Sequence, residues 1–111
     1  MFKTVLTPVK DLDAAKATWS VLLGEPTSDS PYYVGWTLED QEVGLVPGGH
    51  SQGLIGPTPY WHVDDIAATS AALVAAGGTE QQAPQDVGGG RLVALVTDGE
   101  GNLFGLIQDP S

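Results

Sequence analysis

The sequence predicts an α+β fold made of two tandem β-α-β-β-β units, in which a concave mixed sheet forms a cleft and helices cover its convex face. Two observations carry this prediction. A strand pattern, an aspartate, a helical stripe and a glycine follow one another near the N-terminus, and the same order returns later at a constant offset. Asp65 lies 54 positions after Asp11, and Leu73 lies the same distance after Trp19. A repeated order of elements indicates duplicated structure more strongly than a repeated composition does.

The first unit begins with residues 1–9, where apolar and polar side chains alternate as in a strand. Asp11 is a suitable helix N-cap, because its carboxylate accepts hydrogen bonds from unpaired backbone N–H groups. Gly24 is the predicted end of the helix. The apolar stripe of this helix is formed by Leu12, Ala15, Trp19 and Leu22. After the turn-rich residues 25–31, the apolar runs 32–38 and 42–46 predict a hairpin.

The second unit follows a connector, residues 47–57, that is rich in glycine and proline. Residues 58–64 predict a strand, Asp65 a cap, and Gly77 and Gly78 the end of the second helix. Its stripe consists of Ile66, Thr69, Leu73 and Ala76. A loosely polar stretch then leads to two further strands, predicted at 91–96 and 103–107. The chain is thus expected to be one domain, residues 1–111, built from repeats 1–49 and 57–111.

Composition narrows the classes of function. Hydrophobic residues make up 41% of the 111, which suits a globular protein. No apolar run is long enough for a membrane span and no signal pattern precedes the first strand, so a cytoplasmic protein without a membrane partner is expected. A net charge of −10 with four Lys and Arg argues against nucleic acid as a partner. The commoner role of such a net charge is to keep a protein soluble, and the steering of a cationic ligand is the less common one.

Several short motifs resemble the vicinal-oxygen-chelate family, which includes glyoxalase I, extradiol dioxygenases and bleomycin-resistance proteins. The motifs are the cap sequences at 9–12 and 63–66, the helix end Leu23-Gly24, and the stretch 99–106. Their order and repetition make the likeness, because no single motif is specific. The resemblance implies the tandem fold, a homodimer, and two metal-ligand positions in each unit, one early on the first strand and one on the last strand.

The residues at those four positions are unsuited to metal binding. Counting from the cap aspartates places Thr4 and Thr58 on the first strands, and matching the last strands places Gly44 and Gly105 there. Neither residue type supplies a carboxylate or an imidazole. The resemblance therefore implies a metal-free branch without a cofactor. The two glycines have two open interpretations: the close approach of a ligand, or bulges and helix packing.

Other sites for a metal or a nucleophile are disfavoured. His50 and His62 are the two histidines, and His50 lies in the connector. Residues 98–102 begin like a calcium loop, but Leu103 stands where that loop needs glycine, so a hairpin turn is the better interpretation. The chain has no cysteine, which excludes thiolate ligands and a cysteine nucleophile.

Strand alternation predicts which side chains face the cleft. The face with Thr4 also carries Leu6, and the face with Thr58 also carries Tyr60 and His62. His62 is the ionisable group expected in the cleft, as a ligand contact or a general base, although a structural role at the rim is the commoner one. Side chains of the opposite parity are expected to be core beneath the helices: Val5, Val9, Trp61, Val63, Phe104 and Leu106. The candidate ligand-binding residues are Thr4, Leu6, Trp36, Gly44, Thr58, Tyr60, His62 and Gly105.

Three functions are compatible with this pattern, and binding is favoured over catalysis. The first is a metal-independent protein that binds a small, planar, hydrophobic molecule in the cleft, with Tyr60 and Trp36 stacking on it. The alternative is a metal-free lyase, isomerase or hydrolase with His62 as general base. The third is an interaction module whose cleft is filled by its own side chains. A homodimer is expected, because a half-covered sheet leaves apolar surface to protect.

Overall fold

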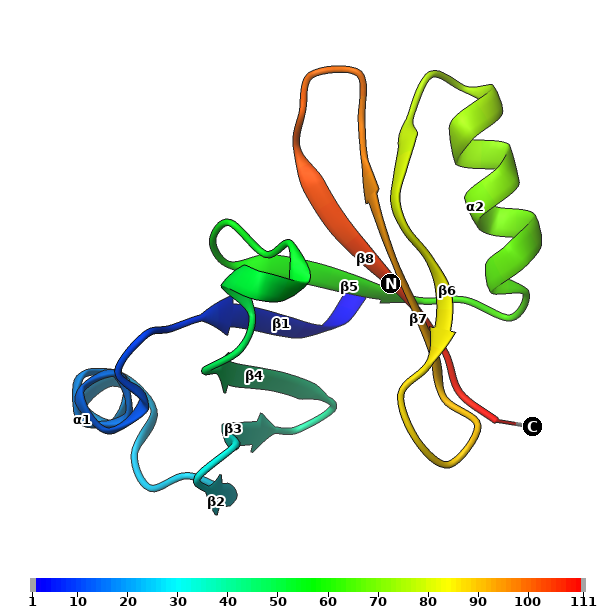
Figure 1. The fold of residues 1–111 in the computed structure, drawn as a ribbon. Coiled ribbons are helices and arrows are strands. Elements are labelled where there is room, and N and C mark those ends of the chain that lie inside the picture. The colour runs from blue at the N-terminus through cyan, green and yellow to red at the C-terminus, as the bar shows by residue number, and fades with distance from the viewer. Residues whose placement is uncertain (1, 111) are drawn as a thin grey trace. The chain divides into compact units, whose positions relative to one another are not determined.

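The computed structural model describes residues 2–110, and its internal contacts divide the chain between Thr58 and Pro59 into two compact units. Each unit contains one helix and four strands of mixed direction, so the fold is α+β and repeats the order β-α-β-β-β, as predicted (Figure 1). Among the described residues, no helix combines the length and the apolar character that crossing a bilayer requires.

The first unit has its strands in the order β2-β3-β4-β1. β4 runs antiparallel to β3 and parallel to β1. A short 3-10 helix, η1 (His50–Gln52), lies in the connector. The elements of this unit are β1 (Phe2–Pro8), α1 (Leu12–Leu23), β2 (Ser28–Ser30), β3 (Tyr33–Leu38) and β4 (Gln41–Val46).

The second unit has its strands in the order β5-β8-β7-β6. β5 is parallel to β8, while β7 is antiparallel to both β8 and β6. The topology of the first unit is therefore repeated strand for strand. The elements are β5 (Thr58–His62), α2 (Ile66–Ala75), β6 (Thr79–Asp86), β7 (Leu92–Thr97) and β8 (Leu103–Gln108).

Both helices begin with the same cap, which confirms the repeat. An Asp11 carboxylate oxygen accepts from the backbone N–H of Ala14 at 3.0 Å, and Asp65 accepts from Ala68 at 3.0 Å. Each cap residue has extended backbone angles, as an N-cap requires. Gly24 follows α1 with a φ of 81°, a conformation that glycine adopts without steric cost.

Three elements differ from the sequence prediction. Strand β2 lies within the stretch predicted to be turn-rich. The stretch from Thr79, described from the sequence as loosely polar, forms strand β6, because β7 supplies a pairing partner that the polar sequence does not reveal. On α1, Leu23 packs into the core, whereas Leu22 is 77% exposed. The stripe starting at Leu12 returns to the core face after three full turns, which is the position of Leu23.

Each sheet packs one face against its own helix. Val34, Trp36 and Leu45 form the core beneath α1, together with half-buried residues that include Trp19. The corresponding core under α2 contains Ile66, Ala94, Val96 and Leu106. Strand alternation then assigns Thr4, Leu6 and Gly44, and Thr58, Tyr60, His62 and Gly105, to the helix-free faces of their own sheets.

Candidate functional site

The helix-free face of the first unit carries three of the predicted residues. Thr4 is buried and lies opposite Glu42 in the register of β1 and β4, and Leu6 lies opposite Gly44. The space above Gly44 is filled by the ring of Tyr33, since a Cβ added to this glycine would lie 2.3 Å from the Tyr33 Oη. Tyr33 donates its hydroxyl hydrogen to the carboxylate of Glu42.

The helix-free face of the second unit repeats this arrangement with a different strand. Tyr60 lies opposite Gly105 in the pairing of β5 with β8. A Cβ at Gly105 would be 2.2 Å from the Tyr60 Cδ2, so the ring occupies the space that the glycine leaves. Burial raises the pKa of Tyr60 to about 12. Beside it, Thr58 is buried and donates to the carbonyl of Gly56.

The two glycines therefore match neither interpretation offered by the sequence. They are neither bulges nor open space beside a ligand; each accommodates a tyrosine of the same unit. Sequence reasoning missed this because Tyr33 and Gly44 are far apart in the chain, and their contact depends on the register of β3 with β4.

His62 belongs to a chain of polar contacts at the end of the same face. Its Nδ1 is 3.1 Å from an Asp109 oxygen, and Arg91 Nε donates to the other oxygen at 2.7 Å. The hydrogen bond from Arg91 holds the pKa of Asp109 below its usual range. Asp109 accepts from Nδ1–H, and in a neutral imidazole Nε2 is then the acceptor nitrogen. This Nε2 is buried and has no hydrogen-bond partner among the described residues.

Trp36 is a correction to the predicted set. Its side chain is 1% exposed and packs in the core beneath α1, and its indole Nε1 donates to the carbonyl of Gly24 at 2.9 Å. Trp36 pairs with Val43, next to Gly44, so it has the opposite parity from the helix-free face. The sequence did not fix this parity, because a one-residue change of register reverses every side chain of a strand.

An apolar groove lies on the other face of the second sheet, beside α2. The helix packs on β6, β7 and β8, and Trp61 on β5 is 40% exposed instead of core as predicted. The groove has a volume of about 540 Å³. Its lining residues are Pro59, Trp61, Val63, Thr69, Leu73, Asn102, Leu103, Phe104 and Leu106.

Two polar side chains line this groove, and both are bonded within the chain. Thr69 Oγ1 donates to the carbonyl of Asp65 at 2.9 Å. Asn102 Nδ2 donates to an Asp98 carboxylate oxygen at 3.0 Å. The side-chain hydrogen bond from Asn102 is the main reason why the pKa of Asp98 lies below its usual value. The predicted hairpin turn at 98–102 is confirmed, and it positions one end of the groove.

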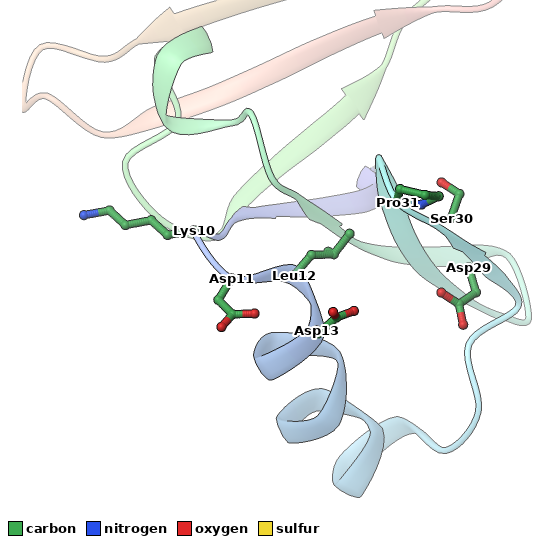
Figure 2. A pocket seen from close by; sticks show the side chains of 7 residues that line it. All are labelled: Lys10, Asp11, Leu12, Asp13, Asp29, Ser30 and Pro31. Atoms are coloured by element: carbon green, nitrogen blue, oxygen red, sulfur yellow. The ribbon is translucent and has the colours of Figure 1, made fainter.

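A second, polar pocket of about 710 Å³ lies in the first unit, between the start of α1 and β2. Figure 2 shows Asp11 and Asp13 on the helix, with Asp29 on the strand side of the pocket. Two of these carboxylates already have structural roles, because Asp11 caps α1 and Asp29 pairs with Lys16. The pocket is therefore a weaker candidate than the apolar groove.

The metal of the resembled family does not fit this chain. Thr4, Thr58, Gly44 and Gly105 offer no carboxylate or imidazole, and tyrosine rings fill the space above both glycines. Over residues 2–110, no three His, Asp or Glu side chains gather closely enough to hold a metal ion.

Comparisons with known proteins identify the fold. A protein described as a glyoxalase/bleomycin resistance protein/dioxygenase superfamily member from Vibrio splendidus 12B01 is similar with a TM-score of 0.71 and 19% identity, covering 98% of this chain and 100% of that chain. The chain has the glyoxalase/bleomycin-resistance/dioxygenase fold. Methylmalonyl-CoA epimerase from Mycobacterium tuberculosis has this glyoxalase-like fold with a TM-score of 0.71 and 15% identity, over 99% of this chain and 88% of that one.

A third similar structure, described as NAD-dependent benzaldehyde dehydrogenase from Legionella pneumophila, has a TM-score of 0.76 and 15% identity, over 96% of this chain and 98% of that chain. No protein-family model matches the sequence, and a comparison with curated protein sequences found no match. Three different descriptions on one fold mean that function must be argued from the residues of this glyoxalase-like chain.

Proposed function

We propose that this glyoxalase-like protein is a metal-independent binding protein for a small, planar, hydrophobic molecule, and that the groove beside α2 is its site. The observation that carries the proposal is the composition of this groove: seven of its nine lining residues are apolar, and Trp61 is 40% exposed within it. Its volume of about 540 Å³ lies within the range of roughly 300–1,000 Å³ of small-molecule sites.

The shape of the ligand follows from the side chains. Trp61 and Phe104 come from the adjacent strands β5 and β8 and have the same parity, so both lie on the face of the sheet that carries the groove. Aromatic rings favour flat partners that stack on them or meet them edge to face. Leu73 of α2 lines the opposite side. A planar ligand inserted between helix and strand would bury both of its faces.

This location differs from the one that the sequence favoured. Tyr60 and Thr58 are 4% and 1% exposed, and Gly44 and Gly105 are covered by tyrosine rings, so the helix-free faces offer little accessible surface at these residues. Metal independence is proposed on the residues at the four family positions, which cannot ligate a metal.

The proposal is tested with a substitution that fills the groove and leaves its polar side chains unchanged. In the first unit, Trp19 stands where α2 has Leu73, so Leu73→Trp transfers a side chain that the fold already accepts at this position. Val74→Trp, at a half-exposed neighbour that does not line the groove, is the matched control. Binding of the neutral planar probe N-phenyl-1-naphthylamine is followed by its own fluorescence, with and without EDTA.

We expect micromolar binding that survives EDTA, a loss of at least tenfold in affinity for Leu73→Trp, and an unchanged affinity for Val74→Trp. Binding that is equal in all three proteins would place the ligand elsewhere and refute the site. Binding that EDTA abolishes and a divalent ion restores would refute metal independence.

A second candidate function is catalysis by His62 as a metal-free general base, and the geometry of its ring favours it. Asp109 fixes the Nδ1–H tautomer, Arg91 holds Asp109, and Nε2 is left as a buried acceptor. Such an arrangement of an acid behind a histidine orients a base. A turnover with this origin would survive EDTA, disappear in His62→Gln, and fall in Asp109→Asn. Activity retained in His62→Gln would exclude this role.

We also propose a homodimer, on the apolar side chains that α1 leaves uncovered. Val21 and Leu22 are 90% and 77% exposed on adjacent positions of this helix. Sedimentation analysis of the wild type and of Leu22→Lys tests this: a dimer that Leu22→Lys dissociates is expected, and a monomer at all concentrations would exclude the proposal.

A further inference from the structure

We infer that the groove selects a planar amine in its cationic form over neutral and anionic molecules of the same shape. This inference rests on the proposed function, because it assumes that the groove beside α2 binds the ligand, and it names the class of ligand. Three independent features support it: the hydrogen-bonding state of the lining residues, the charge of the second unit, and the two aromatic rings.

The polar lining includes two oxygens that can accept hydrogen bonds from a ligand. The single hydroxyl hydrogen of Thr69 is donated to the carbonyl of Asp65, so its oxygen can only accept from a ligand. The orientation of the Asn102 amide is fixed because the Asp98 carboxylate only accepts, which directs Nδ2 to Asp98 and turns Oδ1 away from it. The Thr69 and Asn102 oxygens can therefore accept from a ligand that donates hydrogen bonds, while the second hydrogen of Asn102 Nδ2 and the indole N–H of Trp61 are the donors of the lining.

The charged side chains of the second unit are predominantly negative. Residues 59–111 contain seven Asp and Glu but no Lys, and Arg91 is their one arginine. Arg91 is bound to Asp109, so its charge is compensated locally. No charged side chain lines the groove, while the Asp98 carboxylate contacts Asn102. Asp65 contacts Thr69 through its backbone carbonyl, and its carboxylate accepts from the backbone N–H of Ala68. Hydrogen bonds from Asn102 and nearby backbone N–H groups lower the pKa of Asp98 and keep it ionised at neutral pH.

The aromatic lining suits a cation as well as a flat molecule. The faces of Trp and Phe carry negative quadrupole density, which attracts cations within about 6 Å of the ring centre. An anionic ligand would meet acceptors, ring faces and neighbouring carboxylates without a single basic group in the lining. A delocalised aromatic ammonium would meet favourable contacts at each of them.

The experiment compares three tricyclic probes of nearly equal shape at neutral pH: 9-aminoacridine, which is a cation; acridine, which is neutral; and acridine-9-carboxylate, which is an anion. Affinity is measured by calorimetry at low and at moderate salt. We expect the cation to bind at least tenfold more tightly than acridine and the anion more weakly than acridine. The preference should narrow as salt is added, because exposed charges are screened over about 10 Å at 0.1 M ionic strength.

Two variants locate the source of the preference. Asp98→Asn and Glu100→Gln each remove one charge from the turn at the end of the groove, and Glu100→Gln does so without changing the bonds to Asn102. Each is expected to reduce the preference for the cation severalfold, and Glu100→Gln is expected to do so while the affinity for neutral acridine is retained. Asp40→Asn, an exposed carboxylate of the first unit, is the control and should change neither.

The outcomes separate this inference from the proposed function. If acridine and 9-aminoacridine bind equally, and Leu73→Trp weakens both, the groove is a binding site but the inferred selectivity is wrong. If Asp40→Asn lowers the preference for the cation as much as Asp98→Asn does, this preference comes from the net charge of the whole chain. The inference that the groove selects the cation is then overturned as well. If Leu73→Trp weakens none of the probes, both the site and its selectivity are refuted.

Discussion

The two units share strand order and helix caps but place a large aromatic side chain on different elements. In the first unit Trp19 lies on α1 and packs on the core, while the corresponding position of α2 is Leu73. On the first strand the exchange is reversed: Thr7 in one unit and the half-exposed Trp61 in the other. In the second unit the indole therefore lies on the strand instead of the helix, which leaves a smaller side chain beneath the helix and an exposed ring beside it. A groove can therefore arise inside a duplicated unit without any change of topology.

The tyrosines that cover the glycines also differ between the units. Tyr60 is 4% exposed and its ring crosses Gly105 near its attachment to the backbone, whereas the contact of Tyr33 with Gly44 is made by the far end of a half-buried side chain. A Cβ at Gly44 could be accommodated by moving the hydroxyl end of Tyr33, at the cost of its hydrogen bond to Glu42. A Cβ at Gly105 would meet the buried base of the Tyr60 ring, which is harder to displace.

The largest expected effect tests this difference in rigidity. Gly105→Ala should destabilise the protein by about 3 kcal/mol and Gly44→Ala by about 1 kcal/mol, the two ends of the usual range for overpacking. Urea unfolding of both variants measures the difference. Equal losses would mean that the two tyrosine contacts are equally adaptable.

A second prediction concerns alkaline pH and Tyr60. Because burial raises its pKa from 10.0 to about 12, the folded protein keeps a proton that the unfolded chain loses between these values. The contribution of Tyr60 to the free energy of unfolding should be constant below about pH 10 and fall by up to about 1.4 kcal/mol per pH unit between pH 10 and about pH 12. Tyr60→Phe should remove this contribution, and Tyr32→Phe, at an exposed ring, should not. An unchanged pH profile in Tyr60→Phe would contradict the assignment.

The smallest effect tests what the units have in common. Asp11→Ala and Asp65→Ala should each cost about 1 kcal/mol, since the two caps have the same geometry and the same acceptor distance. The double variant should lose the sum of the two, as expected for separated sites. Thermal unfolding followed by circular dichroism measures the stability of the three variants. A markedly larger loss of stability for one cap would show that the two caps share their geometry but not their contribution to stability.

The sequence predicted the elements that depend on local chemistry. Asp11, Asp65 and Gly24 signal helix ends through their own side chains or lack of one, and strand alternation correctly assigned Tyr60 and His62 to the helix-free parity. The sequence prediction failed where the structure depends on how strands pair. The polar strand β6, the face of Trp36 and the tyrosine above each glycine follow from register, which a single sequence does not display.

The sequence predicted the chemical type of the candidate site better than its position in the fold. His62 was identified from parity, but its partner Asp109 lies 47 residues away, and only the pairing of β5 with β8 brings them together. The groove was missed because Trp61 has core parity. Its exposure depends on how far α2 extends across the sheet, and no property of Trp61 itself records this.

The contact between Tyr60 and Gly105 also constrains how this chain can change through mutation. A metal-binding glutamate at position 105 requires a Cβ where the tyrosine ring lies, so that substitution alone would disrupt the fold before it created a ligand. Tyr60 would first have to become smaller, and by itself that step would leave a cavity with no benefit. A glutamate ligand at position 105 is therefore difficult to reach by single substitutions, because either first step would destabilise the protein.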